Sequence, residues 1–137
     1  MTANGETWTI QGVVFHQRLS DAVVRTGLGD GTFTRENRDR ILSTGVELFG
    51  SLRWRSFFGS LDLTLQNVDL DDPSAPEDQR RPEYQPAVSG SLELGVQAAL
   101  AIDTRLLIDH LGRRYCVNPD LGSDEELEAS TSLGFQL

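Results

Sequence analysis

Few residues of this 137-residue chain have the types and spacing that a catalytic or metal site requires. The two histidines, His16 and His110, lie far apart near the ends of predicted strands, so we expect them at interfaces or loops and not as metal ligands. Cys116 is the single cysteine and lacks a partner for a disulfide or a cysteine metal site. No G-x-S-x-G motif places a nucleophilic serine. We therefore expect no enzymatic activity, no catalytic residue and no cofactor.

Two acidic runs, residues 69–78 and 123–126, could suggest calcium, but neither has the spacing of an EF-hand loop. We expect both runs to be solvated loops, with divalent-ion bridging or ligand contact as the alternatives. The sequence GDG at Gly29–Gly31 predicts a turn, because it lacks the spacing of a nucleotide-binding loop. The sequence therefore predicts no metal site.

The composition excludes several classes of protein. A formal net charge of -9 argues against nucleic-acid binding, which requires a basic surface. The hydrophobic fraction is 38%, and no apolar run approaches the roughly 20 residues of a membrane-spanning helix. Barrel strands stay possible, because their apolar residues alternate with polar ones. Residues 1–9 lack the basic start and apolar core of a signal peptide, so we expect a cytoplasmic protein or a piece of a longer exported one.

Period-two alternation dominates the sequence, and in residues 43–66 it predicts a hairpin with a turn at Arg55 and Ser56. One predicted face is apolar or small, and the other is mainly polar. The first face holds Thr44, Val46, Leu48, Gly50, Leu52, Trp54, Phe57, Gly59, Leu61, Leu63 and Leu65. Phe49 and Phe58 are exceptions that fall on the polar face.

The alternation continues in residues 88–96, 100–108 and 127–137, and two strands joined at the GDG turn complete the set. The connections near residues 55 and 97 are expected to be tight, whereas those at 66–86 and 112–126 are long and polar. Short turns at one end and long loops at the other are typical of outer-membrane barrels. The predicted fold is all-β, an antiparallel up-and-down meander of about six strands of roughly 10 residues each, within one partial barrel domain that covers 1–137.

Charges in the middle of the predicted strands all fall on the polar face, which would line a water-filled barrel interior. These residues are Glu47, Asp62, Glu93, Asp103 and Arg105. With Asp103 and Asp109 on the same strand face, Arg105 is expected to pair across strands.

Aromatic residues near strand ends are expected to form interfacial girdles. They are Trp8, Trp54, Phe57, Tyr84 and Tyr115. Alternation alone leaves a second reading open. A soluble antiparallel sandwich or small barrel would bury the leucine face as its core and act as a binding or interaction module.

Four segments resemble, in order, the C-terminal barrel region of TonB-dependent outer-membrane receptors. In residues 36–54, ENRDRILSTGVELFGSLRW, the positions Asn37, Gly45 and Glu47 match the N-x-G and G-V-E-L elements of that family, with Asp39 in place of its small residue. The opening VVFHQRLSDAVVR is similar to an ascending strand of the family.

Two later segments extend the resemblance. RRPEYQ, with Arg81, Pro82 and Glu83, is similar to the R-P-E-H segment of the family. LIDHLGRRY is similar to its Y-V-G-R-R-Y run, and the matching residues are Gly112, Arg113, Arg114 and Tyr115. Together the four segments cover nearly the whole chain.

The resemblance implies energy-coupled uptake of a scarce ligand, such as an iron–siderophore complex, across the outer membrane. The implied partners are outer-membrane lipid, the remainder of the barrel, a plug domain, TonB acting through that plug, and a small-molecule ligand that the sequence does not identify. The sequence lacks the plug, the TonB box and the signal peptide of the family, and it ends at SLGFQL before the closing strands. We therefore expect a fragment that supplies about six strands of a 22-stranded wall.

Overall fold

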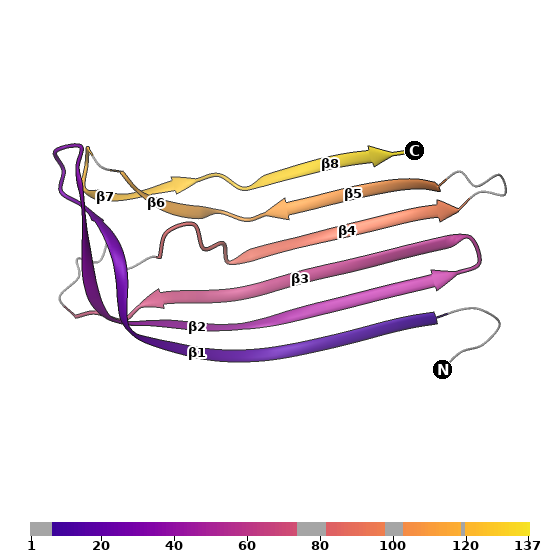
Figure 1. The fold of residues 1–137 in the computed structure, drawn as a ribbon, viewed down its shortest axis with the longest axis horizontal. Coiled ribbons are helices and arrows are strands. Elements are labelled where there is room, and N and C mark those ends of the chain that lie inside the picture. The colour runs from indigo at the N-terminus through magenta and orange to yellow at the C-terminus, as the bar shows by residue number, and fades with distance from the viewer. Residues whose placement is uncertain (1–6, 74–81, 98–102, 119) are drawn as a thin grey trace.

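The computed structural model describes residues 7–73, 82–97, 103–118 and 120–137, and all the regular elements in these ranges are strands. Figure 1 shows them as long, nearly aligned ribbons. The strands are β1 (Thr7–Gly27), β2 (Phe33–Trp54), β3 (Phe57–Leu70), β4 (Val88–Gln97), β5 (Asp103–Leu111), β6 (Arg114–Asn118), β7 (Ser123–Leu127) and β8 (Ser130–Gln136).

Six strands form one antiparallel sheet in the order β1-β2-β3-β4-β5-β8, which curls as a half-barrel. A second, two-stranded sheet pairs β6 with β7. These two strands continue β5 and β8 after short breaks, at residues 112–113 and 128–129, so the chain still runs up and down without a crossover (Figure 1). The predicted all-β meander of about six strands is confirmed.

The strand register places the alternating side chains as the sequence predicted. One row across the sheet joins Leu52, Gly59, Leu94, Leu106 and Phe135. Because side chains alternate faces along each strand, the residues two steps on in either direction extend this apolar row into a band. The opposite face is mainly polar in all six strands.

The two ends of the sheet differ in how the strands are connected. At one end, β2 and β3 are joined by the predicted two-residue turn, in which Arg55 has a φ of 55°. Trp54 and Phe57 flank this turn with ring centroids 6.0 Å apart, and the Arg55 guanidinium lies 5.0 Å from the centre of the Trp54 ring. The last described pair of β4 and β5 joins Gln97 to Asp103. Residues 98–102, which hold the tight connection predicted near residue 97 and the predicted strand start, lie outside the described residues.

The β1–β2 hairpin is about twice as long as the roughly 10 residues expected of each strand, with 21 and 22 residues. Its outer part bends at Asp21, a non-glycine residue with a φ of 54°. The GDG turn is confirmed at its tip, where Leu28 N–H donates to the Thr32 carbonyl at 3.0 Å. Hydrogen bonds from the Thr32 hydroxyl and backbone N–H lower the pKa of the Asp30 carboxyl. The bend carries this tip to β6, near the top left of Figure 1.

Two glycines on the polar face lie beneath aromatic rings of the neighbouring strand. Gly45 pairs with Phe15, and a Cβ at position 45 would lie 2.5 Å from both Phe15 Cζ and the Leu65 carbonyl oxygen. Gly95 pairs with Phe58, whose ring would collide with a Cβ at position 95. An aromatic ring over a cross-strand glycine fills the space of the missing side chain and fixes the register.

The few buried apolar side chains lie at the end with the long connections, away from the apolar band. Among the described residues they are Ala22, Leu70 and Val117. Leu70 pairs with Ile41, and both point to the polar side of the sheet by their position in the alternation. The band itself stays open, because Leu61 and Leu94 in central strands are 44% and 47% exposed. Among the residues described, no helix is long and apolar enough to cross a membrane.

Because the position above Gly45 is already occupied, a single added methyl group there is expected to lower the stability of the fold. We expect Gly45→Ala to destabilise the fold by about 1–3 kcal/mol, because the new Cβ must displace a ring and a backbone carbonyl. Gly50→Ala in the same strand is the matched control, since its nearest neighbouring atom would be Leu61 Cβ at 4.0 Å. Denaturant unfolding followed by tryptophan fluorescence measures both. Equal unfolding midpoints for the two variants would contradict a stabilising contact between the Phe15 ring and Gly45.

Candidate functional site

The five charged residues predicted to share a face do share one. Glu47, Asp62, Glu93, Asp103 and Arg105 come from four different strands, and the register aligns them on the polar side of the sheet. Glu47 and Asp62 are exposed, whereas the other three are half-buried. We call this side the charged face.

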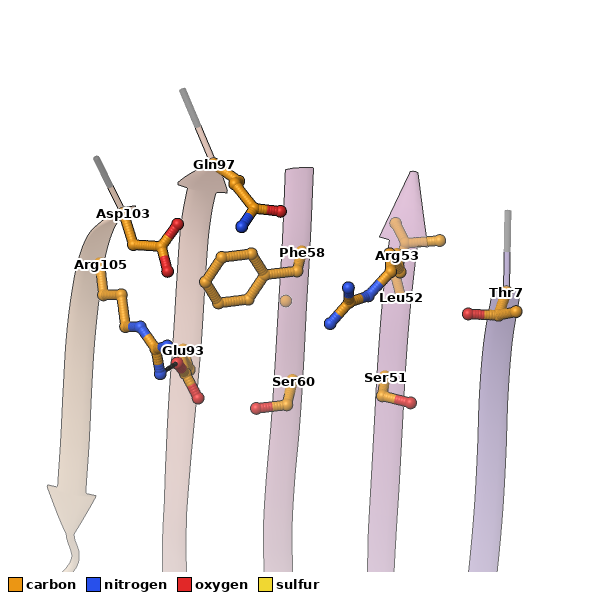
Figure 2. Close-up of a pocket in the computed structure, with 11 residues that line it drawn as sticks. Thr7, Ser51, Leu52, Arg53, Phe58, Ser60, Glu93, Gln97, Asp103 and Arg105 are labelled. Carbon is orange, nitrogen blue, oxygen red and sulfur yellow. Dashed lines mark hydrogen bonds and ion pairs between the residues drawn. The ribbon is translucent and has the colours of Figure 1, made fainter. Parts of the chain in front are cut away.

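An ion pair on the charged face joins β5 to β4. Arg105 Nη1 donates to Glu93 Oε1 at 3.0 Å, which confirms the predicted cross-strand pairing of Arg105. The same guanidinium lies 5.3 Å from the centre of the Phe58 ring. Figure 2 shows Phe58 reaching from β3 toward β4, with Arg105 and Asp103 on one side and Arg53 on the other. These side chains surround a cavity of about 390 Å³ near the tight-turn end of the sheet.

The opposite side of the same strands is the apolar band, which we call the leucine belt. Its members are Trp8, Ile10, Val14, Val46, Leu48, Leu52, Trp54, Phe57, Leu61, Leu63, Leu65, Val88, Leu92, Leu94, Val96, Leu106, Ile108, Leu133 and Phe135. At the edges of the sheet the exposure is highest, with Ile10 at 75% and Leu133 at 73%. An apolar surface on one side and charged residues on the other suit a wall between an apolar and a wet environment.

The residues predicted as an aromatic girdle divide between the two ends. Trp8, Trp54 and Phe57 lie on the leucine belt at the tight-turn end and are 63%, 42% and 52% exposed. Tyr84 and Tyr115 lie at the opposite end, where Tyr84 N–H donates to the Tyr115 carbonyl at 2.8 Å. The Tyr115 hydroxyl donates to Glu126 at 3.0 Å.

Both histidines lie on the leucine-belt side and mark its limit toward the long connections. His16 Nδ1 is 2.8 Å from Thr44 Oγ1, and His110 Nδ1 is 2.9 Å from Thr131 Oγ1. In each case the histidine and the threonine are directly opposite on neighbouring strands. Within the described ranges, no three His, Cys, Asp or Glu side chains are grouped as a metal site would need.

At the long-connection end, Glu83 joins three segments that are distant in sequence. Arg25 of β1 donates two hydrogen bonds to its carboxylate, from Nη2 at 2.8 Å and from Nε at 3.2 Å. The Val117 N–H of β6 donates to the same carboxylate at 3.0 Å. The Arg25 guanidinium also lies 4.1 Å from the centre of the Phe33 ring. We call these four residues and Tyr84 the Glu83 cluster.

The Glu83 cluster is partly shielded from water. The side chains of Arg25 and Glu83 are 37% and 20% exposed. Hydrogen bonding to Glu83 is the main cause that raises the pKa of the Arg25 guanidinium. A cavity of about 660 Å³ lies beside the cluster, between the hairpin tip, the β3–β4 connection and β6.

Most residues of the predicted family motifs have identifiable structural roles. Glu83 binds Arg25 and Val117, Tyr115 accepts a hydrogen bond from Tyr84 of the Glu83 cluster, and Gly45 leaves space for the Phe15 ring. Pro82 beside Glu83 is half-buried. Gly112 lies at the break between β5 and β6, where its N–H donates to the Val88 carbonyl at 2.8 Å. The other motif residues are Asn37, exposed in β2; Glu47, on the charged face; Arg113, in a 3.3 Å ion pair with Glu126; Arg114, paired with Leu127; and Arg81, outside the described residues.

Sequence reasoning missed Arg25, Phe58 and Gly95 as site residues. Phe58 did break the alternation by falling on the polar face, and that was the available signal. Arg25 carried no such signal, because its partner Glu83 is 58 residues away.

The Glu83 cluster predicts a local change in stability. We expect Glu83→Ala to speed hydrogen exchange of the Val117 amide about ten- to hundredfold, because the N–H loses a charged acceptor and Arg25 loses its partner. Glu126→Ala, which removes an exposed ion pair to Arg113 and the hydrogen bond from the Tyr115 hydroxyl but no bond to Val117, is the control and should leave Val117 unchanged. Amide exchange followed by mass spectrometry or NMR measures both. Equal protection of the Val117 amide in the two variants would refute the proposal that Glu83 holds β6 to the other segments.

The comparisons with known proteins leave the family open. No protein-family model matches the chain, and neither curated proteins nor solved structures give a match. The two faces of the sheet and the resemblance of the sequence motifs are the features that bear on function.

Proposed function

We propose that this chain forms part of the wall of a β-barrel in a bacterial outer membrane. The observation that carries the proposal is the leucine belt, which crosses all six strands uncovered while the charged face lies on their other side. Soluble monomers rarely leave a contiguous apolar surface of this extent in water. Lipid would cover the belt without any further polypeptide, and water would solvate the charged face.

The dimensions of the belt support this proposal. Along β2 it runs from Val46 to Trp54, which is eight residue steps or roughly 26 Å at about 3.3 Å per residue. A strand tilt of about 40° reduces this to a height of about 20 Å, close to the apolar band of about 25 Å on membrane barrels. Trp54 and Phe57 border one edge, and polar residues that include His16 and Thr44 border the other. Such borders fit the two interfaces of a membrane.

The resemblance to TonB-dependent receptors extends the proposal to transport. In this proposal the wall belongs to a receptor that takes up a scarce ligand, such as an iron–siderophore complex. A plug domain, TonB, the remaining strands and outer-membrane lipid would be its partners. The arrangement of connections supports this assignment, because the long segments and the Glu83 cluster gather at one end and the tight turn lies at the other.

The alternative function, a soluble sandwich or small barrel that acts as an interaction module, would need the leucine belt to be a core. The buried apolar residues of the described ranges, Ala22, Leu70 and Val117, lie elsewhere. A soluble form would thus need a second layer over the belt from another polypeptide. The lipid-facing proposal needs no such layer, and this favours it.

Adjacent substitutions on the two faces of β4 test the membrane proposal. We expect Leu92→Arg, in the middle of the belt, to weaken folding into lipid vesicles by about 2–4 kcal/mol. Ser91→Arg is the matched control, because Ser91 lies on the charged face between Asp62 and Asp109 of the neighbouring strands and should accept the charge. Tryptophan fluorescence and protease protection in vesicles measure folding. A cooperatively folded, monomeric chain in water without detergent would refute the lipid-facing belt.

The transport proposal has a separate test in cells. In the source organism grown with little iron, we expect the chromosomal Leu92→Arg change to reduce uptake of a radioactive iron–siderophore complex. The Ser91→Arg change should leave uptake near the wild-type rate. Immunoblots of outer-membrane fractions report the amount of each protein. Wild-type uptake by cells whose membranes lack the Leu92→Arg protein would exclude this chain from iron uptake.

A further inference from the structure

The cavity around Phe58 has the features of a small-molecule site, independently of the membrane proposal. One row across the charged face joins Arg53, Phe58, Gly95 and Arg105 on four neighbouring strands. Because residue 95 is glycine, the Phe58 ring lies over the backbone of β4 and not over another side chain. The ring therefore forms an apolar platform between two guanidinium groups (Figure 2).

Polar groups with unused hydrogen-bonding capacity surround the platform. Asp103 Oδ1 is buried and has no hydrogen-bond partner in the described part of the chain. Asp103 lines the cavity, and because a carboxylate can only accept hydrogen bonds, it presents an acceptor to a ligand. Arg53 lines the other side, where its guanidinium can only donate. The cavity therefore offers an acceptor on one side of the ring and a donor on the other.

The size and charge of the cavity restrict the ligand. Its volume of about 390 Å³ is at the small end of the roughly 300–1,000 Å³ found for ligand sites. Its four charged residues balance, because Arg53 and Arg105 offset Glu93 and Asp103. A balanced site gives little net attraction to a phosphate or to a metal cation.

We propose that this cavity binds a neutral sugar of one or two rings. A sugar hydroxyl both donates and accepts hydrogen bonds, so one ring can donate to Asp103 and accept from Arg53. The C–H surface of the ring would lie on the apolar face of Phe58. Ser51, Ser60 and Gln97 line the same cavity and can pair with further hydroxyls.

Saturation-transfer NMR with glucose and maltose tests the proposal. The full chain is used in whichever medium, water or detergent micelles, gives its β-sheet by circular dichroism, so the result does not depend on the membrane proposal. We expect transfer to both sugars, and dissociation constants about tenfold higher in Asp103→Asn, which loses the charged acceptor. Phe58→Leu, which keeps an apolar group over Gly95 but removes the flat ring, should also weaken binding.

Two variants on the same face are the controls. Asp62→Asn and Phe49→Leu make the same chemical changes at residues that do not line the cavity, and they should leave sugar binding unchanged. Absence of transfer to both sugars from the folded protein would overturn the proposal. Equal weakening in the control variants would overturn it too, and so would transfer to the zwitterion glycine betaine without transfer to the sugars.

Discussion

The structure depends on one constraint, the period-two alternation of side chains kept in register across six antiparallel strands. A shift of one residue between any two strands would exchange their faces and place leucines among charges. In the observed register every pair from β1 to β8 keeps apolar side chains together, as in the row from Leu52 to Phe135. The leucine belt and the charged face are therefore two consequences of the same pairing.

Aromatic residues over glycines strengthen this register from the polar side. Phe15 over Gly45 and Phe58 over Gly95 each join two neighbouring strands at one position only, because a Cβ elsewhere would exclude the ring. The same contact that fixes β3 against β4 also exposes the Phe58 ring as the floor of a cavity. The contact of Phe58 with Gly95 thus both fixes the strand register and shapes the cavity on this face.

The sequence predicted the parts of the fold in which alternation is strong. The hairpin of β2 and β3, its turn at Arg55, the faces and the five charged residues all follow from local pattern and turn chemistry. The bend near Asp21 and the outer half of β1 and β2 could not be predicted, because the alternation there is weak and aspartate adopts a positive φ only occasionally. The Arg25–Glu83 pair also depends on the tertiary structure, since it joins segments that only the bend brings together.

The two ends of the sheet are stabilised by different means, and this determines what each can do. At the tight-turn end the contacts are local, between residues that flank a turn and between directly paired strands, as in the Trp54–Phe57 and Arg105–Glu93 pairs. At the other end, a small core and one partly exposed ion pair hold the hairpin tip to β6. The ion pairs at both ends are partly exposed, so water and salt screen each of them. The Phe58 cavity therefore depends on strand register alone, whereas the Glu83 cluster depends on segments far apart in sequence that the long hairpin brings together.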